Sequence, residues 1–228
     1  MGLRHVMGRR HLLGGAPPTP LGDEGSRADA PTGAPGGEDE RLIAGVLRND
    51  RRMFAELYRR HVDSVYARLT RVIGPVSERD DLVQHIFLDV HRALPRFRGE
   101  ARFSTFLHRI VLNVACEHLE RRRRQRGRTL ALEPQHLDGV IAPDASPEAR
   151  VRARQELTEV FRRLESLSPK RRVAFVLVAV EGLSLEEAAA LAGCSPDAVK
   201  QRVLDARREL AREKADLEAK EGGHDELR

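Results

Sequence analysis

The sequence is poor in the residue types on which many metal and redox proteins depend. Its 228 residues include no tryptophan, two tyrosines and only two cysteines, Cys116 and Cys194. Two cysteines cannot form a disulfide framework, and no cluster of cysteine and histidine has the spacing of a zinc site. We therefore predict that the protein holds no metal ion and no cofactor.

Long apolar runs are also missing. The longest covers residues 173–180, whereas a membrane-spanning helix needs about 20 apolar residues. The basic residues near the N-terminus are not followed by the apolar stretch of a secretory signal peptide. These absences favour a soluble, cytoplasmic protein with no membrane insertion.

The usual enzymatic motifs are absent as well. The chain contains no P-loop, no His-Glu-x-x-His pattern, no nucleophile elbow and no glycine-rich dinucleotide turn. Its nine histidines are scattered, and both cysteines lie in apolar helical contexts that suit small core residues. We therefore predict that the protein is not an enzyme.

What the chain does contain is arginine. All but four of its 40 basic residues are arginines, and with 35 acidic residues the net charge is +5. That total alone says little about a partner. The distribution is more informative, because residues 96–128 contain ten arginines and only three acidic residues. One segment therefore concentrates positive charge.

The apolar pattern is helical from about residue 40 onward. Apolar residues recur at spacings of three and four, the period of a buried helical face, and no segment alternates like a strand. We expect the first helix to end at Gly74 and Pro75. Residues 77–80 form a capping-box pattern for a second helix, and a third helix begins near Phe103. The buried face of the first helix consists of Phe54, Leu57, Tyr58, Val62, Val65, Leu69, Val72 and Ile73.

These signals divide the chain into five parts. Residues 1–38 are rich in glycine and proline and are predicted to be a disordered extension. A helical bundle follows over residues 39–128, and residues 129–147 form a flexible linker. A second compact helical domain covers residues 148–214, and residues 215–228 are a polar tail. The prediction is an all-α protein with two small helical domains. Three of its later helices begin at a serine followed by proline, at Ser146, Ser168 and Ser195.

Residues 184–200 have the pattern of a helix-turn-helix. Ser184 and Glu187 form a capping box for a short helix, and Gly193 can adopt the positive φ of the turn. Ala189 is small at the point where the two helices would cross. A plain helical hairpin that binds nothing is the alternative, but we favour DNA binding because these features occur together at compatible spacings.

The second helix of this motif is expected to enter the major groove of DNA. Gln201 is suited to adenine, Leu204 to a thymine methyl group and Asp205 to the amino group of cytosine, while Lys200 shares their outward face. Phosphate contacts anchor a protein without reading sequence. The residues suited to such contacts are Arg202, Arg207 and Arg208.

A second candidate surface lies at the end of the first domain. Four consecutive arginines would end its third helix, and such a run is by itself usually a solvated helix terminus. Aromatic rings, guanidinium groups and an amide beside the run suit unpaired DNA, whose bases can stack and be hydrogen-bonded. Core packing is the alternative for Phe106. The surface consists of Phe97, Arg98, Phe106, Arg109, Asn113, Arg121, Arg122, Arg123 and Arg124.

A third signal is an acidic helix start at Asp80 and Asp81. Compensation of the helix dipole is enough to account for these two carboxylates. A helix that docks on another protein is the functional alternative for residues 80–87.

In this order and at these distances, the segments resemble the extracytoplasmic-function (ECF) class of bacterial RNA polymerase sigma factors. The resemblance covers about residues 40–212. The parts similar to sigma region 2 are residues 54–60 (FAELYRR), 80–87 (DDLVQHIF), 92–100 (RALPRFRGE) and the promoter-melting helix at 103–124. The parts similar to region 4 are residues 167–172 (LSPKRR), 181–184 (EGLS) and the helix-turn-helix.

The resemblance implies a protein that joins core polymerase, directs it to promoters and stabilises melted DNA. Its partners would be core polymerase and promoter DNA, with an anti-sigma protein as a further one because many relatives are held by such a partner. The resemblance assigns polymerase docking to Asp80, Asp81, Leu82, Gln84 and Phe87. It assigns the −10 element to Phe97, Arg98 and Asn113, the last helping to capture a flipped-out base. It assigns the −35 element to Lys200, Gln201, Leu204 and Asp205.

The chain departs from the family pattern at three positions. His85 stands where an acidic residue is usual, Phe106 replaces a common tryptophan, and Asp205 stands where a basic residue is frequent. The alternative function is a helix-turn-helix transcriptional regulator that acts without joining polymerase, and an RNA-binding protein is a third. The first domain discriminates, because a simple regulator needs neither a docking helix nor a surface for unpaired DNA.

Overall fold

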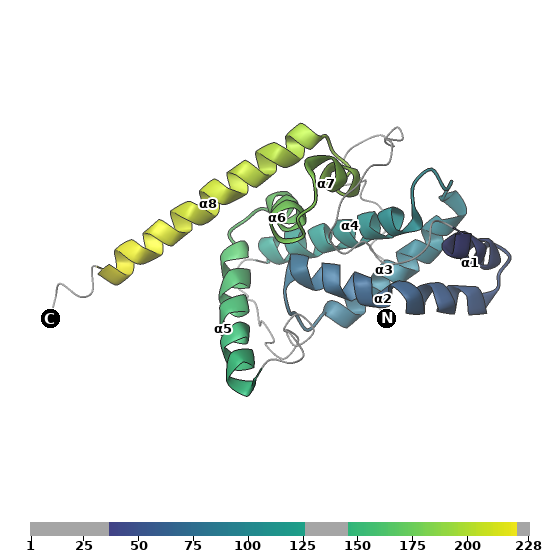
Figure 1. The fold of residues 1–228 in the computed structure, drawn as a ribbon, viewed down its shortest axis with the longest axis horizontal. Helices are drawn as coiled ribbons and strands as arrows, with labels where there is room; N and C mark the ends of the chain where they lie inside the picture. The colour runs from purple at the N-terminus through teal and green to yellow at the C-terminus, as the bar shows by residue number, and fades with distance from the viewer. Residues whose placement is uncertain (1–36, 126–145, 223–228) are drawn as a thin grey trace.

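The structure, a computed structural model, describes residues 37–125 and 146–222, with side chains as far as Ala215 (Figure 1). All regular elements within those ranges are helices, which confirms the all-α prediction. The predicted disordered extension (1–38) and linker (129–147) lie almost wholly outside the described residues. Within the described ranges, no helix is both long and apolar enough to cross a membrane.

The first unit is built around one central helix. Helix α2 packs against α1, α3 and α4, and α4 also packs against α3. The innermost side chains of this unit are fully buried, among them Leu57, Leu69, Ile86 and Leu107. The helices of this unit are α1 (Gly37–Leu47), α2 (Arg51–Ile73), α3 (Arg79–Ala93), the short 3₁₀ turn η1 (Leu94–Arg96) and α4 (Phe103–Arg124).

Local capping residues set both ends of α2, whereas no side-chain cap begins α3. Asp50 caps α2 by accepting a hydrogen bond from the backbone nitrogen of Arg52 at 2.9 Å. Gly74 ends the helix at φ 89°. The capping box predicted over residues 77–80 is wrong, because Glu78 occupies the capping position and makes no side-chain cap. The hydroxyl of Ser77 instead donates to the carboxylate of Glu78 at 3.1 Å.

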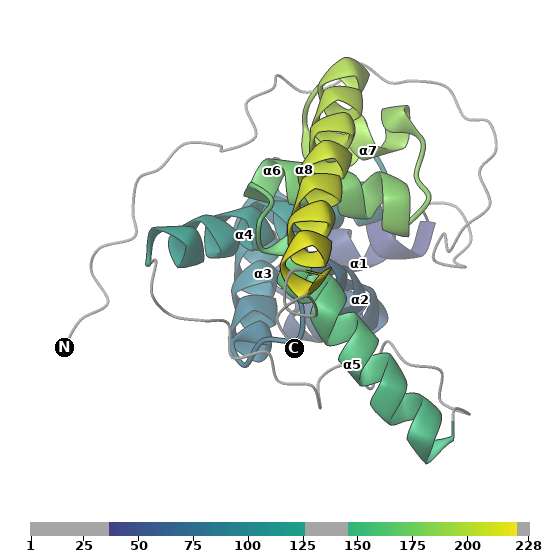
Figure 2. The ribbon, with the colours of Figure 1, turned by 90° about the vertical axis from the view of Figure 1, so that its left-hand side faces the viewer.

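The second unit is smaller, and two of its helices project from the body (Figures 1 and 2). Helices α6 and α7 pack against α8, and only Phe161 and Leu164 of α5 are buried. The last helix continues to Gly222, eight residues beyond the predicted end of the domain at 214. The helices are α5 (Pro147–Leu164), α6 (Pro169–Phe175), the π-helical segment η3 (Val176–Val180), α7 (Leu185–Ala192) and α8 (Pro196–Gly222).

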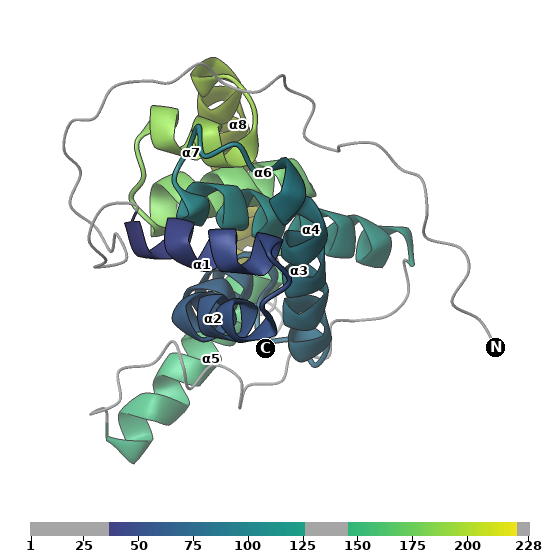
Figure 3. The same cartoon turned by 90° about the vertical axis from the view of Figure 1, so that its right-hand side faces the viewer.

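The two units share one hydrophobic core. Helix α4 lies between α2 and α3 on one side and α6 and α7 on the other (Figure 3). Helix α6 contacts both α8 and α4, η3 packs against α6 and α7, and a second, smaller apolar cluster joins α5 to α8. The sequence analysis treated the units as separate domains and did not anticipate this packing.

Buried polar contacts reinforce the boundary between the units. Arg172 of α6 is only 2% exposed, and its Nε donates to the backbone carbonyl of Val72 at 2.5 Å. Burial lowers the pKa of Arg172 to about 10, so the side chain remains a cation at neutral pH. Glu181 accepts two hydrogen bonds from Arg68, at 2.6 and 3.2 Å, and a third from Arg71 at 3.5 Å.

Candidate nucleic-acid and polymerase-binding surfaces

An aromatic cluster forms the start of the α4 surface. The rings of Phe97 and Phe106 lie 4.9 Å apart between centroids, and both are half-buried. Behind them, Phe103 is 4% exposed and its ring lies 6.0 Å from each of the two. The ring of His61 lies 5.1 Å from Phe103 on the α2 side. Phe106 therefore packs against the core and still reaches the surface, and its contact with DNA stays a prediction.

Polar groups continue this surface along α4. Arg109 and Asn113 follow Phe106 at spacings of three and four and are half-buried. Arg98, in the loop before α4, is exposed and lies 3.8 Å from the carboxylate of Glu100. The structure therefore brings the predicted aromatic, amide and guanidinium groups onto one side of α4 and the loop that precedes it.

The arginine run at the end of α4 divides into two sets. Arg121, Arg123 and Arg124 are exposed. Arg122 is half-buried, and its buried Nη1 has no hydrogen-bond partner within the described residues. The positive charge of Arg122 contributes to the lowered pKa of His118, so its guanidinium is near the core. Three of the four arginines, rather than all four, are thus exposed to solvent, and Arg124 also donates to the carboxylate of Glu120 at 3.4 Å.

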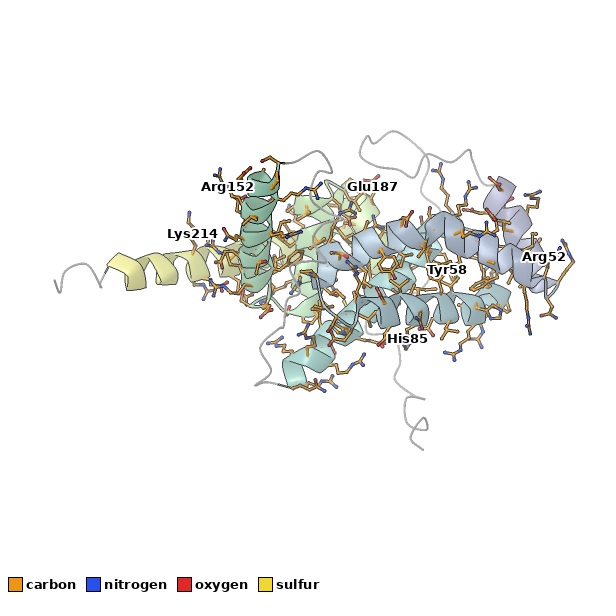
Figure 4. All side chains as sticks on the ribbon, turned by 90° about the horizontal axis from the view of Figure 1, so that it is seen from below. Arg52, Tyr58, His85, Arg152, Glu187 and Lys214 are labelled. Carbon is orange, nitrogen blue, oxygen red and sulfur yellow. The ribbon has the colours of Figure 1, made fainter. Side chains whose placement is uncertain are left out.

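The predicted docking residues of α3 also divide. Asp80, Asp81 and Gln84 are exposed, whereas Leu82 and Phe87 are only 7% and 3% exposed. The ring of Phe87 packs on Tyr58 of α2 at 4.6 Å between centroids, and Tyr58 points from α2 toward α3 (Figure 4). In this structure Leu82 and Phe87 support the helix from inside and offer no surface to a partner.

The outer face of α3 contains residues that the sequence analysis did not propose. Leu88 is 57% exposed, and His85 is exposed and lies 3.2 Å from Asp89 (Figure 4). The helical period of the sequence could have revealed that Leu88 is exposed, because Leu88 falls outside the apolar stripe that contains Phe87 and Val90.

The helix-turn-helix has the predicted local geometry. Ser184 and Glu187 form both hydrogen bonds of a capping box, at 3.1 and 2.8 Å. Gly193 adopts the left-handed conformation at φ 61° and ψ 42°, and ends α7. Ser195 caps α8 by accepting from the backbone nitrogen of Ala198 at 3.2 Å. These caps fix the angle at which α8 leaves the turn.

The side chains of α8 fall into exposed and engaged groups. Lys200, Gln201, Leu204, Arg207 and Arg208 are exposed. Arg202 is half-buried and donates to the thiol sulfur of Cys194 in the turn at 3.2 Å. Asp205 is half-buried and accepts hydrogen bonds from Gln201 and from Arg171 of α6. The sequence analysis did not include Arg171, because its contact with α8 depends on how α6 packs.

Three ionisable side chains inside the molecule, those of Cys116, His108 and His118, are held in their neutral forms, whereas the buried Arg172 stays charged. Burial raises the pKa of the Cys116 thiol to about 12 and lowers the pKa of His108 to about 3. Burial, together with the charge of Arg122, lowers the pKa of His118 to about 4. Among residues 37–125 and 146–222, no group of His, Cys, Asp and Glu side chains could hold a metal ion. These side chains act as packing groups at neutral pH.

Both helical units match known family models. The model described as Sigma-70 region 2 matches residues 57–125, and the model described as Sigma-70, region 4 matches residues 157–210. The first match covers the docking helix α3 and the surface of α4, and the second covers the helix-turn-helix. The first match disfavours a regulator that acts without polymerase, because such a regulator has no need of region 2.

Individual proteins agree with these matches over most of their length. The chain is 32% identical over 173 residues to the ECF RNA polymerase sigma-E factor of Escherichia coli, which is 74% of this chain and 90% of the relative. It is 31% identical to the RNA polymerase sigma-H factor of Pseudomonas aeruginosa, covering 75% and 90% of the two chains. The solved structure of CnrH in complex with the cytosolic domain of CnrY is similar with a TM-score of 0.53 and 30% identity, covering 80% of this chain and 99% of that one. The chain therefore belongs to the ECF family of bacterial RNA polymerase sigma factors.

Proposed function

We propose that three surfaces of this sigma factor have separate roles in promoter-specific transcription initiation. Helix α4 and the loop before it bind the melted −10 element, α8 binds the −35 element, and the exposed face of α3 docks on core polymerase. The protein contributes no chemistry of its own and works in the cytoplasm with polymerase. We also propose that the region 2 unit ends near residue 128 and the region 4 unit spans 148–214.

The observation that carries the −10 assignment is the arrangement of side chains on α4. Phe97 and Phe106 offer half-buried rings on which an unpaired base can stack, and each such stack contributes about 1–3 kcal/mol. Asn113 lies on the same side and can hydrogen-bond the edge of a base. The exposed arginines at the end of α4 suit the phosphate chain. Paired DNA gives such rings no base face, so this surface favours the opened strand.

The −35 assignment rests on the exposed residues of α8. Gln201 and Leu204 can reach base edges in the major groove, while Lys200, Arg207 and Arg208 suit phosphates. For Asp205 the hydrogen bonds to Gln201 and Arg171 argue against a simple role as a base reader. Because Leu82 and Phe87 are buried, we restrict the proposed docking surface to exposed residues of α3. These are Asp80, Asp81, Gln84, His85 and Leu88.

The primary test is transcription by core polymerase on a library of promoters, with and without the purified protein. We expect specific transcripts only when the protein is present. No specific transcript, combined with protection of an operator by the protein alone, would contradict the proposal and favour a regulator that acts without polymerase.

A sharper test separates opening of the promoter from its binding. Asn113→Ala removes the amide proposed to capture a base, so it should reduce open-complex formation about tenfold and leave closed-complex binding nearly unchanged. Permanganate reactivity of unpaired thymines measures opening, and gel shift at low temperature measures closed binding. Glu117→Ala is the matched control, one turn further along α4 and exposed. Equal losses of opening and closed binding in Asn113→Ala would refute base capture.

A protein partner outside polymerase is also proposed. CnrH, the structural relative, was solved with the cytosolic domain of CnrY bound. We infer that this chain, too, is held by a protein that competes with polymerase, an anti-sigma protein. Co-purification of the tagged chain from its host, with and without polymerase inhibition, tests this inference.

A further inference from the structure

The carboxylate of Asp205 is occupied by neighbours within the protein. Its Oδ1 accepts a hydrogen bond from Nε2 of Gln201 at 3.0 Å, and its Oδ2 accepts from Nη2 of Arg171 at 3.4 Å. The Nη1 of Arg208 lies 3.6 Å from Oδ1. A carboxylate has about four acceptor sites, so two hydrogen bonds and the nearby Arg208 cation leave it less capacity for a base than a free carboxylate has.

The bond from Gln201 fixes which groups that side chain can offer. An amide nitrogen carries two protons, and one of them is directed at Asp205. One N–H and the carbonyl oxygen of Gln201 then remain for DNA. Adenine presents an acceptor at N7 and a donor at N6 in the major groove, which complements that remaining pair. Without Asp205 the amide of Gln201 could rotate and offer its two ends in either order.

The charge of Asp205 is balanced by two neighbouring arginines. A carboxylate near phosphates is repelled, but Arg171 and Arg208 stand beside this one. Arg171 also donates to Oε2 of Glu209 at 3.0 Å, so it holds two carboxylates of α8 from its place on α6. The orientation of Asp205 is thereby set by a second helix and not by α8 alone.

We propose that Asp205 is a positioning residue for −35 recognition, which holds the amide of Gln201 in one orientation and contacts no base itself. The inference rests on the proposed role of α8 in binding the −35 element. It replaces the expectation that Asp205 accepts a hydrogen bond from cytosine.

The two roles differ in the base pair that they affect. Gln201 and Asp205 are four residues apart on α8, which is about 6 Å along a helix. Stacked base pairs are about 3.4 Å apart, so the two side chains would face different base pairs. A positioning role changes preference at the base pair of Gln201, whereas base reading changes preference at another one.

The experiment measures base preference with the holoenzyme on promoters whose −35 element is randomised. Gln201→Ala identifies the base pair that Gln201 reads. Asp205→Ala should reduce preference at that same base pair about threefold to tenfold, the cost of leaving the Gln201 side chain unordered. In the Gln201→Ala background, Asp205→Ala should have no further effect there. Glu209→Ala is the matched control, because Glu209 also accepts from Arg171 but lies about two turns of α8 beyond Gln201.

The outcomes separate this inference from the function on which it rests. A wild-type holoenzyme without any −35 preference would overturn the proposed role of α8 and the inference with it. A wild-type preference that Asp205→Ala leaves unchanged at the Gln201 base pair, or changes only at a neighbouring base pair, overturns the inference alone. Asp205→Asn guards against misfolding, because its amide oxygen can still accept from Gln201. This variant should keep the preference at the Gln201 base pair, and losing it there would overturn the inference.

Discussion

Helices α4 and α8 are both proposed to contact DNA, but burial fixes the side chains of α4 and polar pairs fix those of α8. At the start of α4, Phe106 and the preceding loop residue Phe97 rest on Phe103, which is 4% exposed. On α8, Gln201 and Asp205 are held by hydrogen bonds, and the side chain of Asp205 is still 27% exposed. The first surface is built on a core, and the second is built on a solvated network.

The difference predicts which conditions disturb each surface. Salt screens exposed charges strongly and apolar packing hardly at all. Acid should instead disturb α4, because α4 contains two buried neutral histidines, His108 and His118, whereas α8 contains no histidine. Rigid packing suits a site that captures one base, and an adjustable network suits a helix that must find its register on duplex DNA.

The largest effect is expected from Phe103→Ala. Removing this buried ring leaves a cavity beneath Phe97 and Phe106, so the free energy of unfolding should fall by about 3–5 kcal/mol. Leu204→Ala on α8 is the control, since a side chain that is 38% exposed should change stability by less than about 0.5 kcal/mol. Urea denaturation measures both changes. Similar stability losses in the two variants would contradict the contrast between the helices.

The second effect is a loss of stability in acid. Burial, followed by the charges of Arg68, His61 and Arg71, lowers the pKa of His108 to about 3, well below its ordinary value of 6.5. The unfolded chain therefore takes up protons at a higher pH than the folded one. The stabilisation that comes from the neutral His108 is complete above about pH 6.5 and is lost as the pH falls toward 3. We expect the free energy of unfolding to drop by about 2–3 kcal/mol between pH 7 and pH 5.

The variant His108→Leu isolates this contribution. Urea denaturation at a series of pH values should show a smaller acid loss in the variant, by roughly 1–2 kcal/mol, because one titrating group is gone. His118, whose pKa is lowered to about 4, accounts for part of the remainder. An unchanged slope of stability against pH in His108→Leu would show that His108 is not held neutral by the fold.

The local features of this fold could be predicted from the sequence, because their causes lie within a few residues. Gly74 ends α2, Phe103 begins α4, and the capping box of Ser184 and Glu187 begins α7, all as expected. The turn at Gly193 was recognisable because few residues other than glycine tolerate its positive φ. The order of these features was also enough to suggest the family.

The features that were missed depend on contacts between distant parts of the chain. Leu82 and Phe87 were predicted to dock on polymerase, but both are buried, and Phe87 packs against Tyr58 of α2. The buried Arg172 donates a hydrogen bond to the backbone carbonyl of Val72, which is one hundred residues away in the chain. Asp205 could be placed on α8 from its spacing, but its partner Arg171 belongs to α6. No local pattern specifies such pairs, so the sequence could place the candidate residues on their helices but could not give their partners.

The smallest effect tests the contrast most directly, through two double-mutant cycles measured at low and high salt. Arg171→Gln and Glu209→Gln probe an ion pair whose side chains are 40% and 31% exposed, so their coupling energy should be about 0.2–1 kcal/mol at 0.1 M salt. At 1 M salt the screening length is about 3 Å, and this coupling should nearly vanish. Phe97→Leu and Phe106→Leu probe the aromatic pair formed by α4 and the loop before it, whose coupling of about 0.5–1.5 kcal/mol should be the same at both salt concentrations. If both couplings fall with salt, or neither does, then the two surfaces are held by the same forces and their difference in burial has no energetic meaning.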